Sequence, residues 1–128
     1  MLEGSCDCGA VHIELDETPE EVTDCNCGIC RRYGSRWSYF NPRQVRILPP
    51  DGATTIYMRA NRRLEFHRCA VCGCVTHWAA VQKGHPRMGV NMRMFPPEIV
   101  APSARSGRSI SVAVKEVPSN ALTRAVWR

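Results

Sequence analysis

The chain has 128 residues, enough for one domain with a modest hydrophobic core. Its first residues lack the basic segment and apolar run of a secretory signal, and no apolar stretch approaches membrane-spanning length, so we expect a cytoplasmic protein with no membrane partner. Eight cysteines in a reducing compartment favour metal binding over disulfides.

The formal net charge of +5 overstates the charge of a metal-loaded protein. Cysteine ligands lose their protons on binding zinc, so a four-thiolate site carries about −2 and a three-thiolate site about −1. One site of each kind lowers the net charge to about +2. This weakens the case for a nucleic-acid partner, although residues 31–68 hold nine of the seventeen basic residues.

Short strands separated by Gly and Pro predict a mainly β fold. Apolar–polar alternation, or enrichment in β-branched and aromatic residues, predicts strands at residues 11–15, 36–40, 44–48, 54–58, 64–68, 75–81, 88–94 and 109–115. Residues 27–33 predict one helical turn that ends near Gly34, and Pro96 opens a second short helix. We expect one domain over residues 1–128, with residues 116–128 docked or frayed.

Two cysteine pairs have the spacing of zinc ligands. Cys69 and Cys72 enclose two residues and precede Gly73, which permits the positive φ of a zinc knuckle. Cys6 and Cys8 lie on the same side of an extended segment, so both sulfurs can reach one ion. A shared ion would join the start of the chain to a hairpin formed by residues 64–68 and 75–81.

Three more cysteines, Cys25, Cys27 and Cys30, lie within six residues. Three thiolates leave the fourth position of a tetrahedral zinc for water, a substrate or a distant side chain. Such a zinc is a weak Lewis acid and is suited to holding an exogenous thiolate. The alternative is a second structural site, closed by Cys74 or by one of the four histidines.

The remaining candidate ligands are expected to have other roles. We expect Cys74 to be a buried free thiol. His67 and His77 flank the knuckle at strand positions, where packing or hydrogen bonding is the expected role. Neither His12 nor His85 stands out as a ligand.

The cysteine pattern resembles that of the GFA family, which includes glutathione-dependent formaldehyde-activating enzymes and centromere protein V type proteins. The resemblance covers most of residues 4–95. Its motifs are Gly4-Ser-Cys-Asp-Cys-Gly9, Cys25-Asn-Cys-Gly-Ile-Cys-Arg-Arg32, Gly34-Ser35, Cys69-Ala-Val-Cys-Gly73 and Gly89-Val-Asn-Met-Arg93.

The resemblance implies a zinc-stabilised fold of several coiled antiparallel sheets. It also implies a structural zinc on Cys6, Cys8, Cys69 and Cys72, and a second zinc, catalytic in active members, on Cys25, Cys27 and Cys30. The family reaction joins glutathione and formaldehyde into S-hydroxymethylglutathione and is classed as a carbon–sulfur lyase reaction. Asn26 and Cys74 replace a common His and a common small hydroxyl residue, which leaves the substrate of this chain open.

Three functions compete on this evidence. In the first, the protein is an enzyme in which a thiol such as glutathione completes the second zinc site and adds to a small carbonyl; the candidate substrate residues are Arg31, Arg32, Asn91 and Arg93. In the second, it is a non-catalytic, zinc-stabilised module whose basic stretch, residues 31–68, binds nucleic acid or a protein. A redox role for the Cys27–Cys30 dithiol ranks last, because the pair lacks a βαβ context.

Overall fold

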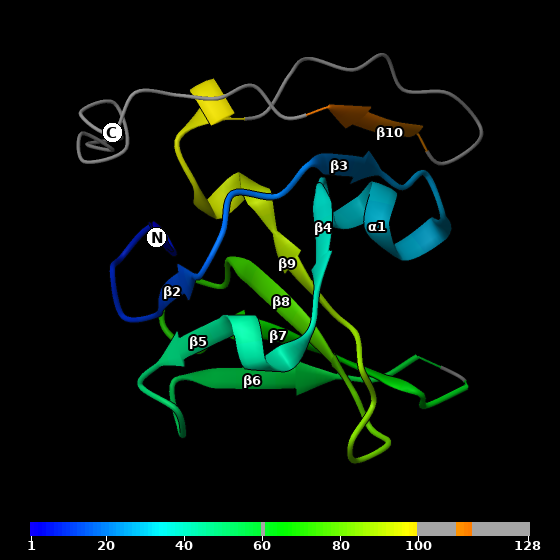
Figure 1. The fold of residues 1–128 in the computed structure, drawn as a ribbon. Helices are drawn as coiled ribbons and strands as arrows, with labels where there is room; N and C mark the ends of the chain where they lie inside the picture. The colour runs from blue at the N-terminus through cyan, green and yellow to red at the C-terminus, as the bar shows by residue number, and fades with distance from the viewer. Residues whose placement is uncertain (60, 100–109, 114–128) are drawn as a thin grey trace.

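The computed structural model describes residues 1–59, 61–99 and 110–113, the last of these as backbone alone. It is mainly β, with one short α-helix and three 3-10 turns among the described residues (Figure 1). A three-stranded sheet has the order β1-β2-β5, and a seven-stranded sheet has the order β10-β3-β4-β9-β8-β7-β6. The neighbouring strands pair antiparallel, which confirms the predicted fold class.

The small sheet gathers the start of the chain onto a later strand. Strand β1 (Leu2–Ser5) pairs with β2 (His12–Leu15), which pairs in turn with β5 (Val45–Leu48). In β2 the alternate side chains of Ile13 and Leu15 point into the core, because neighbouring residues of a strand face opposite sides, and Leu2 of β1 joins them. The turn between β1 and β2 holds the first two cysteines.

The large sheet is built around the β7–β8 hairpin, which carries the second knuckle at its tip, as predicted. Its strands are β3 (Glu21–Asp24), β4 (Trp37–Phe40), β6 (Thr54–Tyr57), β7 (Leu64–Cys69), β8 (Val75–Ala80), β9 (Met88–Asn91) and β10 (Ile110–Ala113). A bulge between His67 and Arg68 breaks the register with β8 next to the knuckle. Bulges bend a strand locally, so this one re-aims the strand end that carries Cys69.

Two apolar clusters fill the interior. The first packs β1, β2 and β5 against β9 and the residues that follow it, and includes Leu2, Ile13, Val90 and Phe95. The second surrounds Trp37 with Cys30, Phe66 and Trp78, and Cys25 packs against it. Burial of apolar surface therefore supports the second cysteine cluster directly.

Helix α1 (Gly28–Tyr33) confirms the predicted helical turn and lies beside β3 and β4 in Figure 1. It ends at Gly34, which has a φ of 65° and donates its N–H to the carbonyls of Arg31 and Cys30. Glycine adopts this left-handed conformation without the steric cost of a side chain. The end of the helix is thus set by one residue.

Several sequence-based boundaries need correction. Strands β1 and β3 were not predicted, and the predicted strand at residues 88–94 ends at Asn91 and continues as a 3-10 turn, Met92–Met94. Asn91 causes this change, because its side chain accepts a hydrogen bond from the Arg93 N–H and caps the turn.

The other short elements follow the predictions more closely. One 3-10 turn, Pro42–Gln44, joins β4 to β5, and the predicted second helix is a 3-10 turn, Pro97–Ile99. Residues 116–128 lie outside the described residues. Within the part of the chain that is described, no helix is long and apolar enough to cross a membrane.

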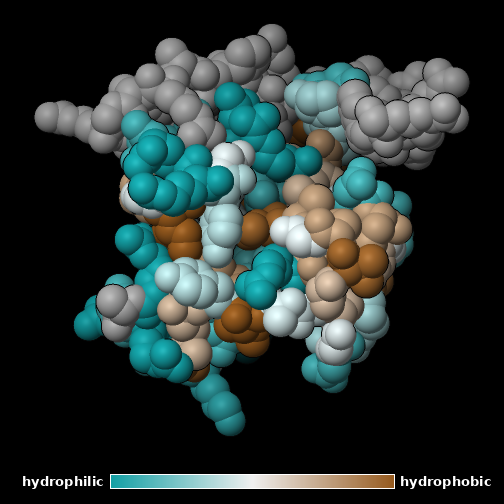
Figure 2. Space-filling view, turned by 180° about the vertical axis from the view of Figure 1, so that it is seen from behind, coloured by the Kyte–Doolittle hydropathy of each residue, from teal (hydrophilic) through white to brown (hydrophobic). Residues whose placement is uncertain are grey.

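The exposed apolar side chains are distributed over several places. Figure 2 shows hydrophobic atoms in separate patches with hydrophilic residues between them. Ile56 and Tyr57 are neighbours on β6, the last strand of the large sheet, and about half of each side chain is exposed. Val71 is exposed at the knuckle.

Candidate metal centres

The first centre brings together four sulfurs from opposite parts of the chain. The Sγ atoms of Cys6, Cys8, Cys69 and Cys72 all lie within 4.8 Å of one another. The Cys6–Cys8 and Cys8–Cys69 Sγ distances are both 3.7 Å. A tetrahedral zinc with Zn–S bonds of about 2.3 Å requires S–S separations of about 3.8 Å, so the four thiols fit this ion.

Backbone N–H groups point at these sulfurs. The Val11 N–H donates to Cys6 Sγ at 3.3 Å, and the N–H groups of Val71 and Cys72 donate to Cys69 Sγ at 3.4 and 3.5 Å. Gly9 and Gly73 each have a φ of +80°, so both turns use a glycine directly after the second cysteine. The two knuckles thus share one backbone feature, a glycine with positive φ after the second cysteine, as the spacing predicts.

The sulfurs of this centre differ in acidity. The Ala10 N–H lowers the pKa of Cys8, but loss of solvation and the neighbouring thiols raise it to about 12. Cys72 shows the opposite shift. Burial raises the pKa of Cys72, but backbone N–H groups at Cys74 and Cys8, and neighbouring thiols, lower it to about 6. A hydrogen bond to the charged form favours that form, and the thiolate is the form that binds metal. This centre therefore matches a closed, four-sulfur site.

The second centre has three sulfurs. The Sγ atoms of Cys25, Cys27 and Cys30 lie within 4.8 Å of one another, and no fourth Cys, His or acidic residue of the described chain completes the group. Cys30 is buried within α1, Cys25 is half-buried and Cys27 is exposed. Such a set fits a zinc with one position left for an outside ligand.

Two hydrogen bonds distinguish the inner and outer sulfurs. The Trp37 Nε1–H donates to Cys30 Sγ at 3.3 Å from inside the core, and Arg59 Nη1 lies 4.0 Å from Cys27 Sγ on the outside. Burial raises the pKa of Cys30 to about 12 despite the bond from Trp37. Burial also raises the pKa of Cys27, but hydrogen bonds from the Cys30 backbone and the neighbouring thiols lower it to about 7. Without metal, the negative charge would reside on the outer sulfur.

Cys74 belongs to the neighbourhood of the first centre. It packs against the cluster of Cys6, Val11 and Cys69, and its backbone carbonyl accepts the Cys69 N–H at 2.8 Å. It is half-buried, which corrects the expectation of a buried thiol. It is not among the sulfurs of the second centre, so the idea that Cys74 closes that centre is not supported.

The predicted substrate residues surround the helix of the second centre. Arg31 and Arg32 lie on α1, where Arg32 Nη1 donates to the Gly28 carbonyl at 2.8 Å. Arg93 Nε donates to the Gly34 carbonyl at 3.0 Å, at the other end of the helix.

Asn91 is buried and already engaged within the protein. Its Oδ1 accepts the N–H groups of Arg36 and Arg93, both at 3.1 Å, and its Nδ2 donates to the Val75 carbonyl at 2.7 Å. These bonds give Asn91 a structural role, whatever else it does.

Arg59 was missed by the sequence analysis. It follows β6, and 32 positions separate it from Cys27, the cysteine whose sulfur it approaches. A surplus of arginine in this stretch was visible, but only the fold selects this residue.

Comparison with known proteins identifies the chain. The model of a family described as glutathione-dependent formaldehyde-activating enzyme (GFA) matches residues 1–106. The chain belongs to the GFA family. A crystal structure of a Rhodobacter sphaeroides protein is 27% identical, has a TM-score of 0.57, and aligns over 73% of this chain and 86% of that one. No curated protein matches the chain.

The GFA chain also contains a stacked histidine pair beside its first centre. The rings of His67 and His77 are 4.2 Å apart and nearly parallel, and they bond to Thr54 Oγ1 and Thr76 Oγ1 at 2.8 and 2.9 Å. Burial, together with the His67 ring, lowers the pKa of His77 to about 3. Both rings are therefore neutral packing groups near neutral pH, in agreement with the predicted packing role.

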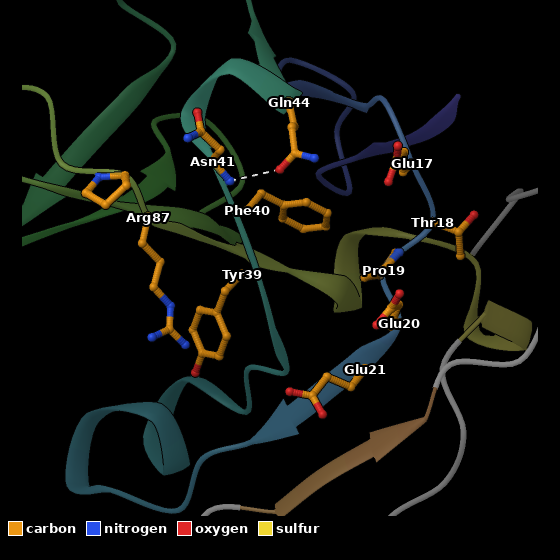
Figure 3. A pocket seen from close by; sticks show the side chains of 11 residues that line it. Glu17, Thr18, Pro19, Glu20, Glu21, Tyr39, Phe40, Asn41, Gln44 and Arg87 are labelled. Atoms are coloured by element: carbon orange, nitrogen blue, oxygen red, sulfur yellow. Dashed lines mark hydrogen bonds between the residues drawn. The ribbon is translucent and has the colours of Figure 1, made fainter.

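A hollow of about 630 Å³ lies elsewhere on the GFA fold, between β3, β4 and the loop before β9 (Figure 3). Glu17, Glu20 and Glu21 line one side, and Tyr39 lies on the other beneath the guanidinium of Arg87, at 3.9 Å. No cysteine lines it. The hollow is therefore separate from both cysteine centres.

Proposed function

We propose that this protein is a zinc-dependent enzyme of the carbon–sulfur lyase type, which joins a glutathione-type thiol to a small carbonyl such as formaldehyde, or splits the adduct. The observation that carries the proposal is the second centre, in which three thiols converge and one of them, Cys27, is exposed to solvent. Membership of the GFA family supports glutathione and formaldehyde as the substrates.

The two centres have different roles in this proposal. Cys6, Cys8, Cys69 and Cys72 hold a structural zinc that joins the β1–β2 turn to the β7–β8 hairpin. Cys25, Cys27 and Cys30 hold the working zinc, which when bound supplies a soft, open position for a thiolate sulfur. We assign residues 1–128 to one domain and a cytoplasmic location, where glutathione is plentiful.

The protein residues bind and orient. Trp37 holds the sulfur of Cys30 with its N–H, so the innermost thiolate keeps its place. Cys27 lies at the opening, where an incoming thiol meets it. Arg31 and Arg32 offer guanidinium groups to the carboxylates of a peptide thiol. Arg93 bonds the Gly34 carbonyl at the end of α1, and Asn91 bonds the Arg36 N–H and the Val75 carbonyl.

The bond changes are simple and involve no oxidation. The thiol sulfur forms a bond to the carbonyl carbon, the C=O π pair moves to oxygen, and that oxygen takes up the proton the thiol lost. Holding the two reactants in the right geometry would lower the barrier, because it makes a bimolecular step effectively unimolecular.

Exchange NMR with ¹³C-formaldehyde and glutathione tests the proposal. We expect the protein to increase the rate at which S-hydroxymethylglutathione forms and splits, Cys27→Ser to abolish the increase, and Cys74→Ser to retain it. An unchanged exchange rate with protein carrying two zinc ions per chain would remove the enzymatic function.

The alternative is a non-catalytic module that binds nucleic acid or a protein. Three exposed arginines next to the half-exposed Tyr57 support it: Arg59, Arg62 and Arg63. An electrophoretic shift assay at two salt concentrations tests it, since phosphate binding weakens steeply with salt.

A further inference from the structure

The surface beside the second centre carries two guanidinium groups over one small residue. A methyl group added to Gly28 would meet Arg32 Nη1 at 3.5 Å and Arg59 Nη2 at 3.8 Å. Both nitrogens therefore lie within 4 Å of one point, next to Cys27 in the chain. Arg32 comes from α1 and Arg59 from the segment after β6, so the fold brings them together.

Neither arginine is paired with a carboxylate in the described part of the chain. Arg46, by contrast, pairs with the carboxylates of Glu14 and Asp16. Arg32 donates to the neutral Gly28 carbonyl, and Arg59 lies near the Cys27 sulfur. Each guanidinium has five N–H donors, so both retain several for an outside acceptor.

The position of Arg59 beside Cys27 also favours an anion that contains a thiol group. Arg59 Nη1 lies 4.0 Å from Cys27 Sγ while Nη2 of the same fork faces Gly28. A thiol bound at the opening would thus have its sulfur on one side of Arg59 and the rest of the molecule over Gly28. Two like charges held close together repel, and a carboxylate between them removes the repulsion.

We propose that Arg32 and Arg59 form a carboxylate clamp over Gly28 that selects anionic thiols for the second centre. This rests on the proposed function, because the thiol must bind at the open position of that centre. The absence of a side chain at Gly28 leaves room for the carboxylate between the guanidinium groups. Neutral and cationic thiols would bind through sulfur alone.

Isothermal titration of the zinc-loaded protein tests the clamp with three thiols of similar size: 3-mercaptopropionate, 2-mercaptoethanol and cysteamine. Arg32→Gln and Arg59→Gln are each expected to weaken the binding of 3-mercaptopropionate about fivefold, which is the effect of one exposed ion pair. The affinity for 2-mercaptoethanol should not change. Comparing variants on the same thiol cancels the differences in thiol acidity. Cysteamine should bind the variants slightly better, because a positive charge has been removed.

The matched control is Arg63→Gln, which removes an exposed arginine after β6 and should change no affinity. Arg59→Lys retains the charge but loses the fork, so it should recover only part of the preference. Zinc content and melting temperature establish that each variant is folded.

The outcomes separate the two proposals. If the variants lose the same affinity for all three thiols, or lose none, the clamp is overturned but the proposed thiol binding stands. If the wild-type protein binds none of the thiols, the proposed function fails and the clamp fails with it. An additional Gly28→Val variant should obstruct the clamp and weaken 3-mercaptopropionate more than 2-mercaptoethanol.

Discussion

Cysteine has three different environments in this chain, and the neighbours of each sulfur decide its role. Cys6 and Cys69 are buried and accept backbone N–H groups, as structural zinc ligands do. Cys27 is exposed beside Arg59, at the side of the centre that solvent reaches. Cys74 packs near the first centre without being one of its four convergent sulfurs.

The Trp37 indole is predicted to tune the second centre. Trp37→Phe keeps the ring in the core but removes the N–H that bonds Cys30 Sγ at 3.3 Å. Loss of a hydrogen bond to a metal ligand typically weakens metal binding by about 10-fold or more. Competition with a zinc chelator should show the labile zinc of this variant released at lower chelator concentration. Equal release from wild type and variant would contradict the role assigned to Trp37.

His77 is predicted to make stability depend on acid. Burial, with the His67 ring, lowers its pKa from about 6.5 to about 3, so the folded protein binds fewer protons than the unfolded chain between these values. The stabilisation is complete above pH 6.5 and is lost as pH falls toward 3. Between pH 7 and pH 5, the shifted pKa of His77 should lower the free energy of unfolding by about 2 kcal/mol. Urea unfolding should show that His77→Phe loses less stability than the wild-type protein between these two pH values. An equal loss of stability in both proteins would contradict the role assigned to His77.

At the scale of elements, the sequence predicted what local patterns encode. Helix α1, the knuckles and most strands follow from alternation, from glycine and from cysteine spacing. Strand β3 was missed because three of its four residues are buried in succession, so it lacks alternation. Arg59 was missed because its place beside Cys27 depends on where the fold puts the segment after β6, and no short pattern encodes that contact.

The contact between β8 and β9 depends on a missing side chain. A Cβ at Gly89 would overlap the indole of Trp78, which leans onto the backbone of β9. Gly89→Ala must push the ring aside, and overpacking of this kind costs about 1–3 kcal/mol. Chemical denaturation should show that loss. A free energy of unfolding equal to that of the wild-type protein would contradict this contact.

At the scale of the whole molecule, the first zinc is predicted to connect the two sheets through the turns that carry the cysteine pairs. It would tie the β1–β2 turn of the small sheet to the β7–β8 hairpin of the large one. The three-ligand site should lose its metal first on chelation, with little change in circular dichroism. Removal of the second equivalent should unfold the protein, since structural zinc contributes directly to folding. Simultaneous loss of both ions would contradict this division.

The central claim is that one centre is closed and the other open to a thiol. Zinc-edge X-ray absorption of protein with two zinc ions per chain measures this directly. The account predicts about 3.5 sulfur ligands per zinc, averaged over both sites, and an increase to about 4 when glutathione is added. An average of 4 before glutathione, or no increase after it, would contradict the account.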